Sequence, residues 1–324
     1  MSDRPYLRIA TRRSPLAVAQ GEMVRARLAA ALGVDAAAAE EAFPILTFVT
    51  TGDRQQTGSL AEIGGKGLFV KEIEMALLTK EADIAVHSMK DLPAEMPTGL
   101  IQAATPPRDD PRDAFLSPGG GTLDDLPQGA RVGTSSVRRA AQALRRRPDL
   151  SIVEMRGNVQ TRLGKLEAGA ADGTFLAEAG LVRLGRTDVV RRVLEPDVML
   201  PALGQGVLCV QSREDDEAAR AACGAINDVP TELATAAERA FVAALDGSCR
   251  TPMAGLAQVR GGKLHFEAQI LTLDGKRAMR RERTIALHGR DHDDCLLDAI
   301  AAGAEMAQEL AEEAGPLLVE MLSR

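Results

Sequence analysis

The sequence predicts an α/β protein with a smaller α+β domain at its C-terminal end. From residue 7 to about residue 228, short apolar runs alternate with segments of helical spacing, which is typical of a wound, mostly parallel sheet. The alternation occurs twice, and this predicts two similar α/β units. Beyond residue 228, three β-like segments follow one another, which predicts an antiparallel sheet. A length of 324 residues fits two or three domains.

The first α/β unit opens with an expected strand at 7–10 and a helix at 16–32. Pro15 stands at the start of that helix, where its missing N–H costs little. The alanine-rich stretch 36–39 indicates a loop or a helix end. The other elements expected in this unit are a helix at 67–79 and strands at 45–50, 83–87, 100–104 and 114–116.

The second α/β unit repeats the pattern. Its expected helices lie at 136–147, where Pro148 stops the helix, and at 158–168. Its expected strands lie at 130–133, 152–155 and 175–177, the last followed by another helix. A further strand at 207–210 could belong to either sheet, and the residues alone do not decide between them.

The C-terminal part begins with a helix at 231–245, for which Thr231 is a plausible N-cap. The three β-like segments that follow are joined by Gly261-Gly262 and Asp274-Gly275, which are both hairpin signals. The segments themselves span 253–259, 263–273 and 277–287, and helices are expected at 296–314 and 317–322.

Composition excludes several classes of protein. No apolar run is long enough to span a membrane, and residues 1–14 are charged and lack the apolar core of a secretory signal. The four cysteines form no C-x-x-C pair, which disfavours zinc knuckles and disulfide frameworks and favours reduced thiols in a cytosol. Aromatic residues make up only 2% of the chain, too few for a base-stacking surface.

The charge is unevenly distributed. The net charge is −7, yet residues 131–165 contain nine basic side chains and two acidic ones, and residues 291–324 contain nine acids and one arginine. A basic focus in an acidic protein indicates a polyanionic ligand more than bulk nucleic-acid binding. The alternative is a solvated helix face, which would suit Arg145, Arg146 and Arg147.

Three polar stretches follow expected strands and precede expected helices: 11–14, 133–136 and 156–158. Backbone N–H groups at helix N-termini, hydroxyls and arginine side chains can together bind a carboxylate or phosphate beyond the carboxyl ends of the strands. The alternative is that these Ser, Thr and Asn side chains only cap helices. The glycine-rich stretch 64–67 could be a flexible loop or a lid over an anion. A nucleotide P-loop motif is absent from the sequence.

Two further residues are candidates for chemistry. Asp91 ends an apolar strand, where it could form a structural ion pair with Lys90 or could move protons and stabilise a cation. Cys249 lies in a polar turn beside Arg250, a setting that favours the thiolate. Cys209 and Cys223 lie in an apolar strand and a helix and are expected to be inert packing, and Cys295 lies on the acidic helix.

Ten runs of the sequence resemble the porphobilinogen deaminase (hydroxymethylbilane synthase) family. They occur in the family's order from Leu7 to about Val259, and the resemblance weakens in the last sixty residues. The runs are LRIATRRSPLA, GGKGLFVKEIE, ADIAVHSMKDLP, DPRDAF, VGTSSVRR, RRPDL, RGNVQTRLGKL, LAEAGLVRLG, LPALGQG and DGSCRTP.

The resemblance implies three domains and a reaction. Residues 1–106 with 207–224 and residues 107–206 would form two α/β domains like the lobes of periplasmic binding proteins, and 225–324 a smaller α+β domain with a three-stranded antiparallel sheet. The implied enzyme is a transferase that deaminates four porphobilinogen molecules and joins them head to tail into linear hydroxymethylbilane, in tetrapyrrole (porphyrin, heme or chlorophyll) biosynthesis.

The resemblance also implies a cofactor and a set of site residues. The cofactor is a dipyrromethane joined to Cys249 by a thioether, and Asp91 is the catalytic carboxylate that stabilises the electron-poor azafulvene formed when ammonia leaves. Further implied cofactor contacts are Lys90, Asp91, Thr134, Ser136, Arg138, Arg139, Arg162, Gly180 and Ser248. Implied substrate contacts are Arg12, Ser14, Gln20, Lys66, Phe69, Arg156, Arg183 and Gln205. Because every pyrrole carries an acetate and a propionate, arginine is the expected partner.

The same resemblance places the enzyme in the cytoplasm. It implies porphobilinogen as the ligand, with no metal, nucleic acid, membrane or obligatory protein partner, and a product passed to the next enzyme. The sequence departs from the family pattern at Glu62, where lysine is frequent, at Arg13, where glutamine is common, at 173–175, which is less aliphatic, and at Glu178.

Two other functions compete with the transferase. A bilobal α/β protein could simply bind an anion, since fold does not fix function, but such a module needs no reactive thiol like Cys249. Nucleic-acid binding through 131–165 is disfavoured by the net charge and the few aromatic residues.

Overall fold

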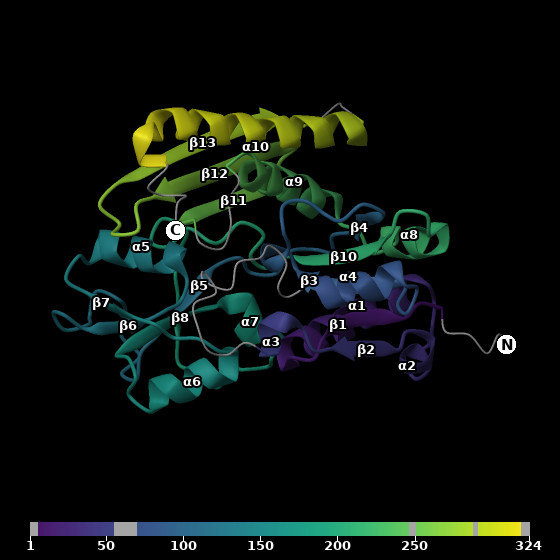
Figure 1. Ribbon diagram of the computed structural model, residues 1–324, viewed down its shortest axis with the longest axis horizontal. Coiled ribbons are helices and arrows are strands. Elements are labelled where there is room, and N and C mark those ends of the chain that lie inside the picture. Colours follow the sequence, from purple (N-terminus) through teal and green to yellow (C-terminus); the bar gives the residue numbers. More distant parts are fainter. Residues whose placement is uncertain (1–5, 55–69, 246–250, 288–290, 319–324) are drawn as a thin grey trace. The chain divides into compact units, whose positions relative to one another are not determined.

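The computed structural model describes residues 6–54, 70–245, 251–287 and 291–318 (Figure 1). The chain divides into two compact units. The first consists of Met1–Asp109 and Val207–Glu232, and the second of Asp110–Gly206 and Leu233–Arg324. Within the described residues, none of the helices is both long and apolar enough to cross a membrane.

The first unit is built on a five-stranded sheet with the order β2-β1-β3-β10-β4. Strand β1 runs parallel to β2 and β3, whereas β10 runs antiparallel to β3 and β4. The strands are β1 (Ile9–Arg12), β2 (Ile45–Phe48), β3 (Ile84–Ser88), β4 (Leu100–Ala104) and β10 (Leu208–Arg213). The strand near 207–210, which the residues alone left unassigned, therefore completes the first sheet.

Helices cover both faces of this sheet. Successive strand residues point to opposite faces, so Ile9 packs with Val24 and Leu28 of α1, while Ala10 packs with Ile73 and Leu77 of α4. The helices are α1 (Pro15–Ala31), α2 (Ala39–Ala42), α3 (Thr51–Arg54), α4 (Lys71–Leu78), the 3₁₀ turn η1 (Met89–Asp91) and α8 (Glu217–Gly224).

The α/β part of the second unit repeats this arrangement with the strand order β7-β6-β8-β5-β9. Strand β6 is parallel to β7 and β8, and β5 is antiparallel to β8 and β9. The strands are β5 (Asp113–Leu116), β6 (Arg131–Gly133), β7 (Ser151–Val153), β8 (Gly173–Ala177) and β9 (Arg192–Val193), with helices α5 (Val137–Arg146), α6 (Val159–Glu167) and α7 (Glu178–Arg183).

The prediction of two similar α/β units is confirmed, and so is the prediction of mostly parallel sheets, because four of the five strands in each sheet run in one direction and only β10 or β5 runs against them. The reason for the reversed strand lies in the chain path. Strand β5 is the first strand after the chain enters the second unit, and β10 is the first strand after it returns to the first unit. Each of these two strands runs against the direction of the parallel strands in its sheet.

The C-terminal part forms a three-stranded antiparallel sheet, as predicted, so the α/β plus α+β fold class is confirmed. It contains β11 (Met253–Arg260), β12 (Lys263–Leu271) and β13 (Ala278–Ala286), with helices α9 (Val229–Ala244) and α10 (His292–Ala314). Arg260 pairs with Lys263, so Gly261 and Gly262 form a two-residue turn, and both have the positive φ that this turn requires. Phe241 of α9 meets Phe266 of β12 edge-on at 5.8 Å between ring centres.

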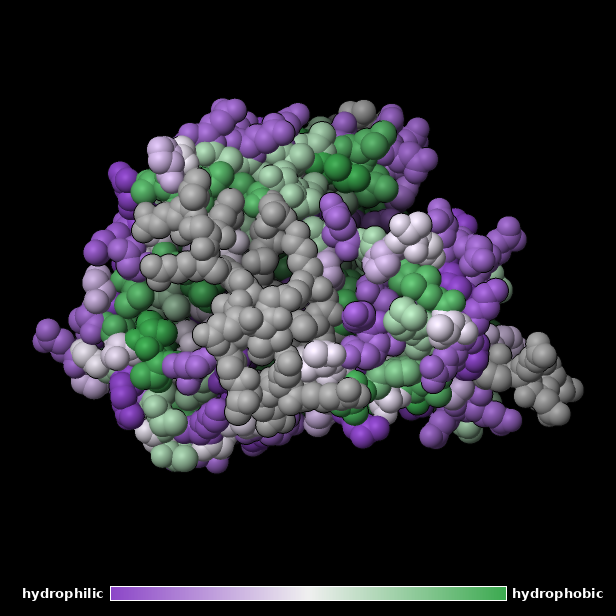
Figure 2. Space-filling model, viewed as in Figure 1, coloured by the Kyte–Doolittle hydropathy of each residue, from purple (hydrophilic) through white to green (hydrophobic). Residues whose placement is uncertain are grey.

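Most acidic side chains of helix α10 are exposed, and Figure 2 shows hydrophilic residues along the outer edge of this helix. Three of its glutamates pair with arginines of β13: Glu305 and Glu309 with Arg283, and Glu313 with Arg281. The negative charge of the C-terminal stretch is thus partly neutralised by the arginines of β13.

The loop between β12 and β13 packs directly on α5, which joins the C-terminal sheet to the α/β part of the second unit. A Cβ atom on Gly275 would lie 2.3 Å from the carbonyl oxygen of Ala141 and 2.6 Å from the backbone nitrogen of Arg145. Only glycine fits against the helix backbone at this distance.

Three local predictions have different outcomes, and only the first is wrong. Thr231 is not the N-cap of its helix, because α9 begins at Val229 and the Asp228 carboxylate accepts the Thr231 N–H at 3.0 Å. The stretch 36–39 ends where the short helix α2 begins. The expected helix at 317–322 lies mostly outside the described residues.

Candidate active site

The site residues expected in the first unit lie where β1 and β3 end. Arg12 is the last residue of β1, and Lys90 and Asp91 belong to η1, which follows β3 directly. Because β1 and β3 are parallel, these residues lie at one edge of the sheet. This is the edge at which open α/β sheets usually bind ligands.

Asp91 is exposed, and its carboxylate makes no hydrogen bond or ion pair within the part of the chain that the structure describes. One of the two interpretations of Asp91 was a structural ion pair with Lys90, and the described structure does not contain that pair. An exposed carboxylate at a strand end can accept a proton from a ligand or stabilise a positive charge on it.

Ser14 and Gln20 organise this edge from α1. The Ser14 hydroxyl caps the helix by accepting the Ala17 N–H at 3.3 Å. Gln20 is buried and donates from Nε2 to the Ser88 hydroxyl at 2.9 Å, which ties α1 to the end of β3. Both side chains thus form hydrogen bonds that stabilise the fold next to Lys90 and Asp91.

A buried network of polar side chains includes His87 of β3, which lies a few residues before Lys90 and Asp91 in the chain. His87 Nε2 lies 3.1 Å from Gln211 Oε1, and Gln211 Nε2 donates to Glu74 Oε1 at 3.1 Å. Burial lowers the pKa of His87 to about 4, with a smaller contribution from the charge of Arg12, so the imidazole is neutral at pH 7. The network links β3, β10 and α4, which sequence reasoning did not anticipate.

In the second unit, the expected residues follow the carboxyl ends of the three parallel strands β6, β7 and β8. Thr134 and Ser136 lie between β6 and α5. The Ser136 hydroxyl caps α5 by accepting the Arg139 N–H at 3.4 Å, and Thr134 Oγ1 accepts the Ser136 N–H at 3.1 Å. The Ser136 hydroxyl is therefore a helix cap, as the alternative interpretation held, and the Thr134 hydroxyl stabilises the turn before the helix. The Ser135 hydroxyl between them is buried without a partner in the described structure.

Arg138 and Arg139 are 5% exposed and share one fully buried carboxylate, that of Asp113 in β5. Arg138 Nη1 lies 2.7 Å from Asp113 Oδ2 and donates to the Leu200 carbonyl at 2.7 Å. Arg139 donates to Asp113 Oδ1 from Nη2 at 2.6 Å and from Nε at 3.0 Å, and from Nη1 to the Phe175 carbonyl at 3.0 Å.

The electrostatics of this cluster favour an anion. Burial by itself would raise the pKa of Asp113, but the charges of Arg138 and Arg139 hold it well below its ordinary value, so the carboxylate stays ionised. Two guanidinium groups against one carboxylate leave a net charge of +1 in a buried place. Since buried charges are normally paired, this excess is suited to a ligand carboxylate.

Gln205 belongs to the same cluster. It is fully buried, and its Nε2 donates to the Pro111 carbonyl at 2.7 Å and to Asp113 Oδ1 at 3.1 Å. In this arrangement Gln205 contacts Asp113 and backbone, so the role expected for it as a substrate contact stays a prediction.

The remaining arginines surround the other two strand ends. Half-buried Arg156 donates from Nε to Glu154 at 2.6 Å, and Arg162 donates to the Gly157 carbonyl at 2.9 Å. Beyond β8, Arg183 of α7 donates to the Gly206 carbonyl at 2.7 Å, and Gly180 is buried in the same helix.

The structure accounts for Glu178, one of the departures from the family pattern. Glu178 is 6% exposed and forms a two-point ion pair with Arg191, with Nη2–Oε1 at 2.6 Å and Nε–Oε2 at 2.7 Å. The partner lies thirteen residues away across a loop, so no local sequence pattern predicts the pair.

Several expected site residues lie outside the described residues, namely Cys249, Ser248, Lys66 and Phe69, as do Glu62 and the glycine-rich stretch 64–67. The other cysteines, Cys209, Cys223 and Cys295, are buried and form no disulfide in the described structure. Burial raises the pKa of Cys223 to about 12, which fits its expected inert role. Among the described residues no cluster of His, Cys, Asp or Glu could hold a metal ion.

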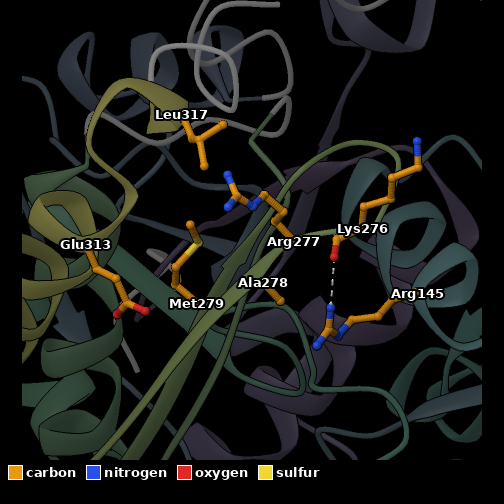
Figure 3. Close-up of a pocket in the computed structure, with 7 residues that line it drawn as sticks. All are labelled: Arg145, Lys276, Arg277, Ala278, Met279, Glu313 and Leu317. Atoms are coloured by element: carbon orange, nitrogen blue, oxygen red, sulfur yellow. Dashed lines mark hydrogen bonds between the residues drawn. The ribbon is translucent and has the colours of Figure 1, made fainter.

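A surface pocket of about 450 Å³ lies elsewhere in the second unit (Figure 3). Arg145 of α5 reaches into it and lies with Nη1 3.4 Å from the Lys276 carbonyl oxygen. None of the expected site residues lines this pocket, so it is separate from the strand-end clusters. Its lining consists of Arg145, Lys276, Arg277, Ala278, Met279, Glu313 and Leu317.

Comparison with known proteins identifies the family. The family model for the porphobilinogen deaminase "dipyromethane cofactor binding domain" matches residues 7–221, and the model for the porphobilinogen deaminase C-terminal domain matches residues 233–313. Among solved structures, the periplasmic VFT2 domain of BvgS from Bordetella pertussis aligns with a TM-score of 0.38 at 13% identity, covering 68% of this chain and 86% of that one. A likeness this low supports no argument.

Curated relatives match over nearly the whole chain. The porphobilinogen deaminase of Caulobacter vibrioides is 49% identical over 323 residues, covering 98% of this chain and 99% of the relative. That of Paracoccus denitrificans is 51% identical over 307 residues, covering 95% and 93%. Both the family models and these relatives carry the same assignment, and the chain belongs to the porphobilinogen deaminase family.

Proposed function

We propose that the activity of this family, the synthesis of hydroxymethylbilane from porphobilinogen, depends in this chain on Asp91 as the catalytic carboxylate and on a dipyrromethane attached to Cys249. The observation that carries the proposal is the contrast between the two sets of strand-end residues. One set presents an exposed carboxylate without a partner among the described residues, and the other presents buried arginines with an excess positive charge.

The residues of the second unit fit a ligand that carries acetate and propionate groups. The Arg138–Asp113–Arg139 cluster has a net charge of +1, and Arg138 bonds to described residues through Nη1 alone, so the N–H groups of Nε and Nη2 remain for a ligand. The buried Ser135 hydroxyl beside them has no partner in the described structure. Arg138, Arg139, Thr134, Ser136 and Arg162 would hold the cofactor carboxylates here, with Gly180 beside them.

The chain's own residues then perform the following tasks. The cofactor supplies the pyrrole carbon from which the new chain grows. Arg12, Arg156 and Arg183 hold the carboxylates of the incoming substrate, since the planar guanidinium matches a carboxylate with two N–H groups. Asp91 lies at the end of β3, where it stabilises the positive charge that develops as the substrate loses ammonia, and accepts the proton released when the new bond forms.

The cellular setting and domain division are part of the same proposal. We assign residues 1–106 with 207–224, 107–206 and 225–324 to three domains, which the presence of three separate sheets supports. The buried thiols, which form no disulfide in the described structure, support a reducing cytoplasm. Porphobilinogen is the ligand, and the product passes to the next enzyme without an obligatory protein partner.

The intact mass of the purified protein tests the cofactor assignment. We expect the chain to be heavier than its sequence by two deaminated pyrrole units, with the added mass on the peptide that contains Cys249. Cys249→Ala should lose both the added mass and porphobilinogen turnover. The control is Cys209→Ala, which replaces a thiol in β10 by alanine in the same way. It should keep both the added mass and the turnover. An unmodified and fully active chain would contradict the proposal.

A further inference from the structure

Asp113 is a member of the strand-end clusters to which neither the sequence nor the proposed reaction assigns a role. It lies in β5 with no exposed surface and belongs to the run DPRDAF. Yet it contacts three residues that are expected to bind cofactor or substrate: Arg138, Arg139 and Gln205.

The contacts leave these three side chains little freedom. Arg139 is held at three N–H groups, two of them on Asp113 Oδ1 and the third on the Phe175 carbonyl. Gln205 is held between the same Asp113 oxygen and the Pro111 carbonyl. One carboxylate therefore fixes side chains that come from α5 and from the segment before β10.

The charge of Asp113 matters as much as its position. Without it, two guanidinium groups that are 95% buried would lie side by side with no counter-charge, and their mutual repulsion would drive them apart or toward solvent. With it, the pair is compatible with burial and still has one positive charge left to attract an anion. Preorganised donors of this kind bind a ligand without having to be oriented first.

We propose that Asp113 is a positioning residue, which holds Arg138, Arg139 and Gln205 as one preformed receptor for a carboxylate of the bound pyrrole chain. This inference rests on the proposed function. Asp113 touches no reacting atom and acts only through the two arginines and the glutamine. Its contribution should therefore appear first in how completely the chain acquires its cofactor.

The test compares Asp113→Asn with Glu178→Gln. Both variants remove the charge of a buried carboxylate paired with arginine in the same unit, but Glu178 contacts Arg191 and not the cluster. For each holoprotein as purified, we would measure the urea unfolding midpoint and the fraction of chains with added mass. We expect both variants to unfold earlier than wild type, and only Asp113→Asn to show a holo fraction at least threefold lower.

The outcomes separate the two hypotheses. A wild-type chain without added mass would overturn the proposed function itself. A wild-type holo fraction in folded Asp113→Asn would overturn only the positioning role. If Asp113→Asn does not fold, Asp113→Glu replaces it, since it keeps the charge but moves the carboxylate by one methylene. A lowered holo fraction in that variant supports positioning, and an unchanged one shows that charge alone suffices and overturns it.

Discussion

The two five-stranded sheets have the same strand arrangement, and yet the carboxylates at their strand ends lie in opposite environments. In the first unit, β3 leads to Asp91, whose carboxylate is exposed and has no partner among the described residues. In the second unit, the corresponding edge carries arginines, and the carboxylate there, Asp113, is fully buried and bonded to two of them.

The difference shows that burial decides what a carboxylate can do. Asp113 is held ionised by its arginines and cannot meet a ligand, so its effect is structural and electrostatic. Asp91 faces solvent and is able to meet a ligand and exchange a proton with it. One backbone arrangement thus carries an exposed carboxylate in one unit and a buried arginine cluster in the other, because the side chains at the strand ends differ.

The largest expected effect comes from removing the charge of the exposed carboxylate. Asp91→Asn is nearly isosteric and should leave folding and cofactor attachment intact, but the amide can neither accept a proton nor neutralise a cation. General acid–base groups contribute ~10²–10⁴-fold, so porphobilinogen turnover by the cofactor-loaded variant should fall by about that factor.

The matched control for this variant is Glu95→Gln, which makes the same chemical change at another exposed residue a few positions along the chain. It should retain wild-type turnover. Near-normal turnover in Asp91→Asn would show that Asp91 is not the catalytic carboxylate. The exposed and the buried carboxylate would then not differ in function in the way proposed.

A smaller effect concerns the stability of the first unit at low pH. The folded-state pKa of His87 is about 4, below its ordinary value of 6.5, so only the unfolded chain binds a proton in the range between them. Above pH 6.5 the histidine adds no pH dependence. As the pH falls from 6.5 to 4, the free energy of unfolding should decrease by up to about 3 kcal/mol because of His87.

Urea unfolding at pH 7, 5.5 and 4.5 would measure this loss. In His87→Gln the amide can still donate to Gln211, and the part of the acid sensitivity due to His87 should disappear. His265→Gln, which alters an exposed histidine of β12, should keep the wild-type dependence. Identical pH profiles for wild type and His87→Gln would show that the buried network does not oppose protonation.

Much of the fold was predictable, because it depends on patterns local in the sequence. The alternation of strands and helices, the Gly261-Gly262 turn and the helix caps Ser14 and Ser136 all follow from neighbouring residues. The sheet that β10 joins was not predictable in this way, because it depends on where the chain returns after passing through the second unit.

The same limit applies to the candidate site. Strand-end position and residue type pointed to the arginines, but not to the carboxylate that binds two of them. Asp113 precedes Arg138 by 25 residues and Gln205 by 92, so only the folded sheet brings them together. The pairing of Glu178 with Arg191 was likewise hidden.

The smallest expected effect tests the binding side of the contrast. Under the proposed function, Arg156→Ala removes one charge-assisted contact to a substrate carboxylate, which is worth roughly 1.5–3 kcal/mol. Substrate capture should weaken by about ten- to a hundredfold, or elongation should stop at the step that first needs this arginine. Mass spectrometry of the enzyme during turnover would show which chain length accumulates.

Arg146→Ala serves as the control, since it removes the same charge from the same basic stretch. Arg146 is 42% exposed and pairs with Asp124 at the surface, and such pairs contribute only about 0–1 kcal/mol. Elongation in that variant should proceed as in wild type. If both variants behave alike, bulk positive charge and not the strand-end position of Arg156 holds the substrate, because the two substitutions differ only in where the lost guanidinium was placed.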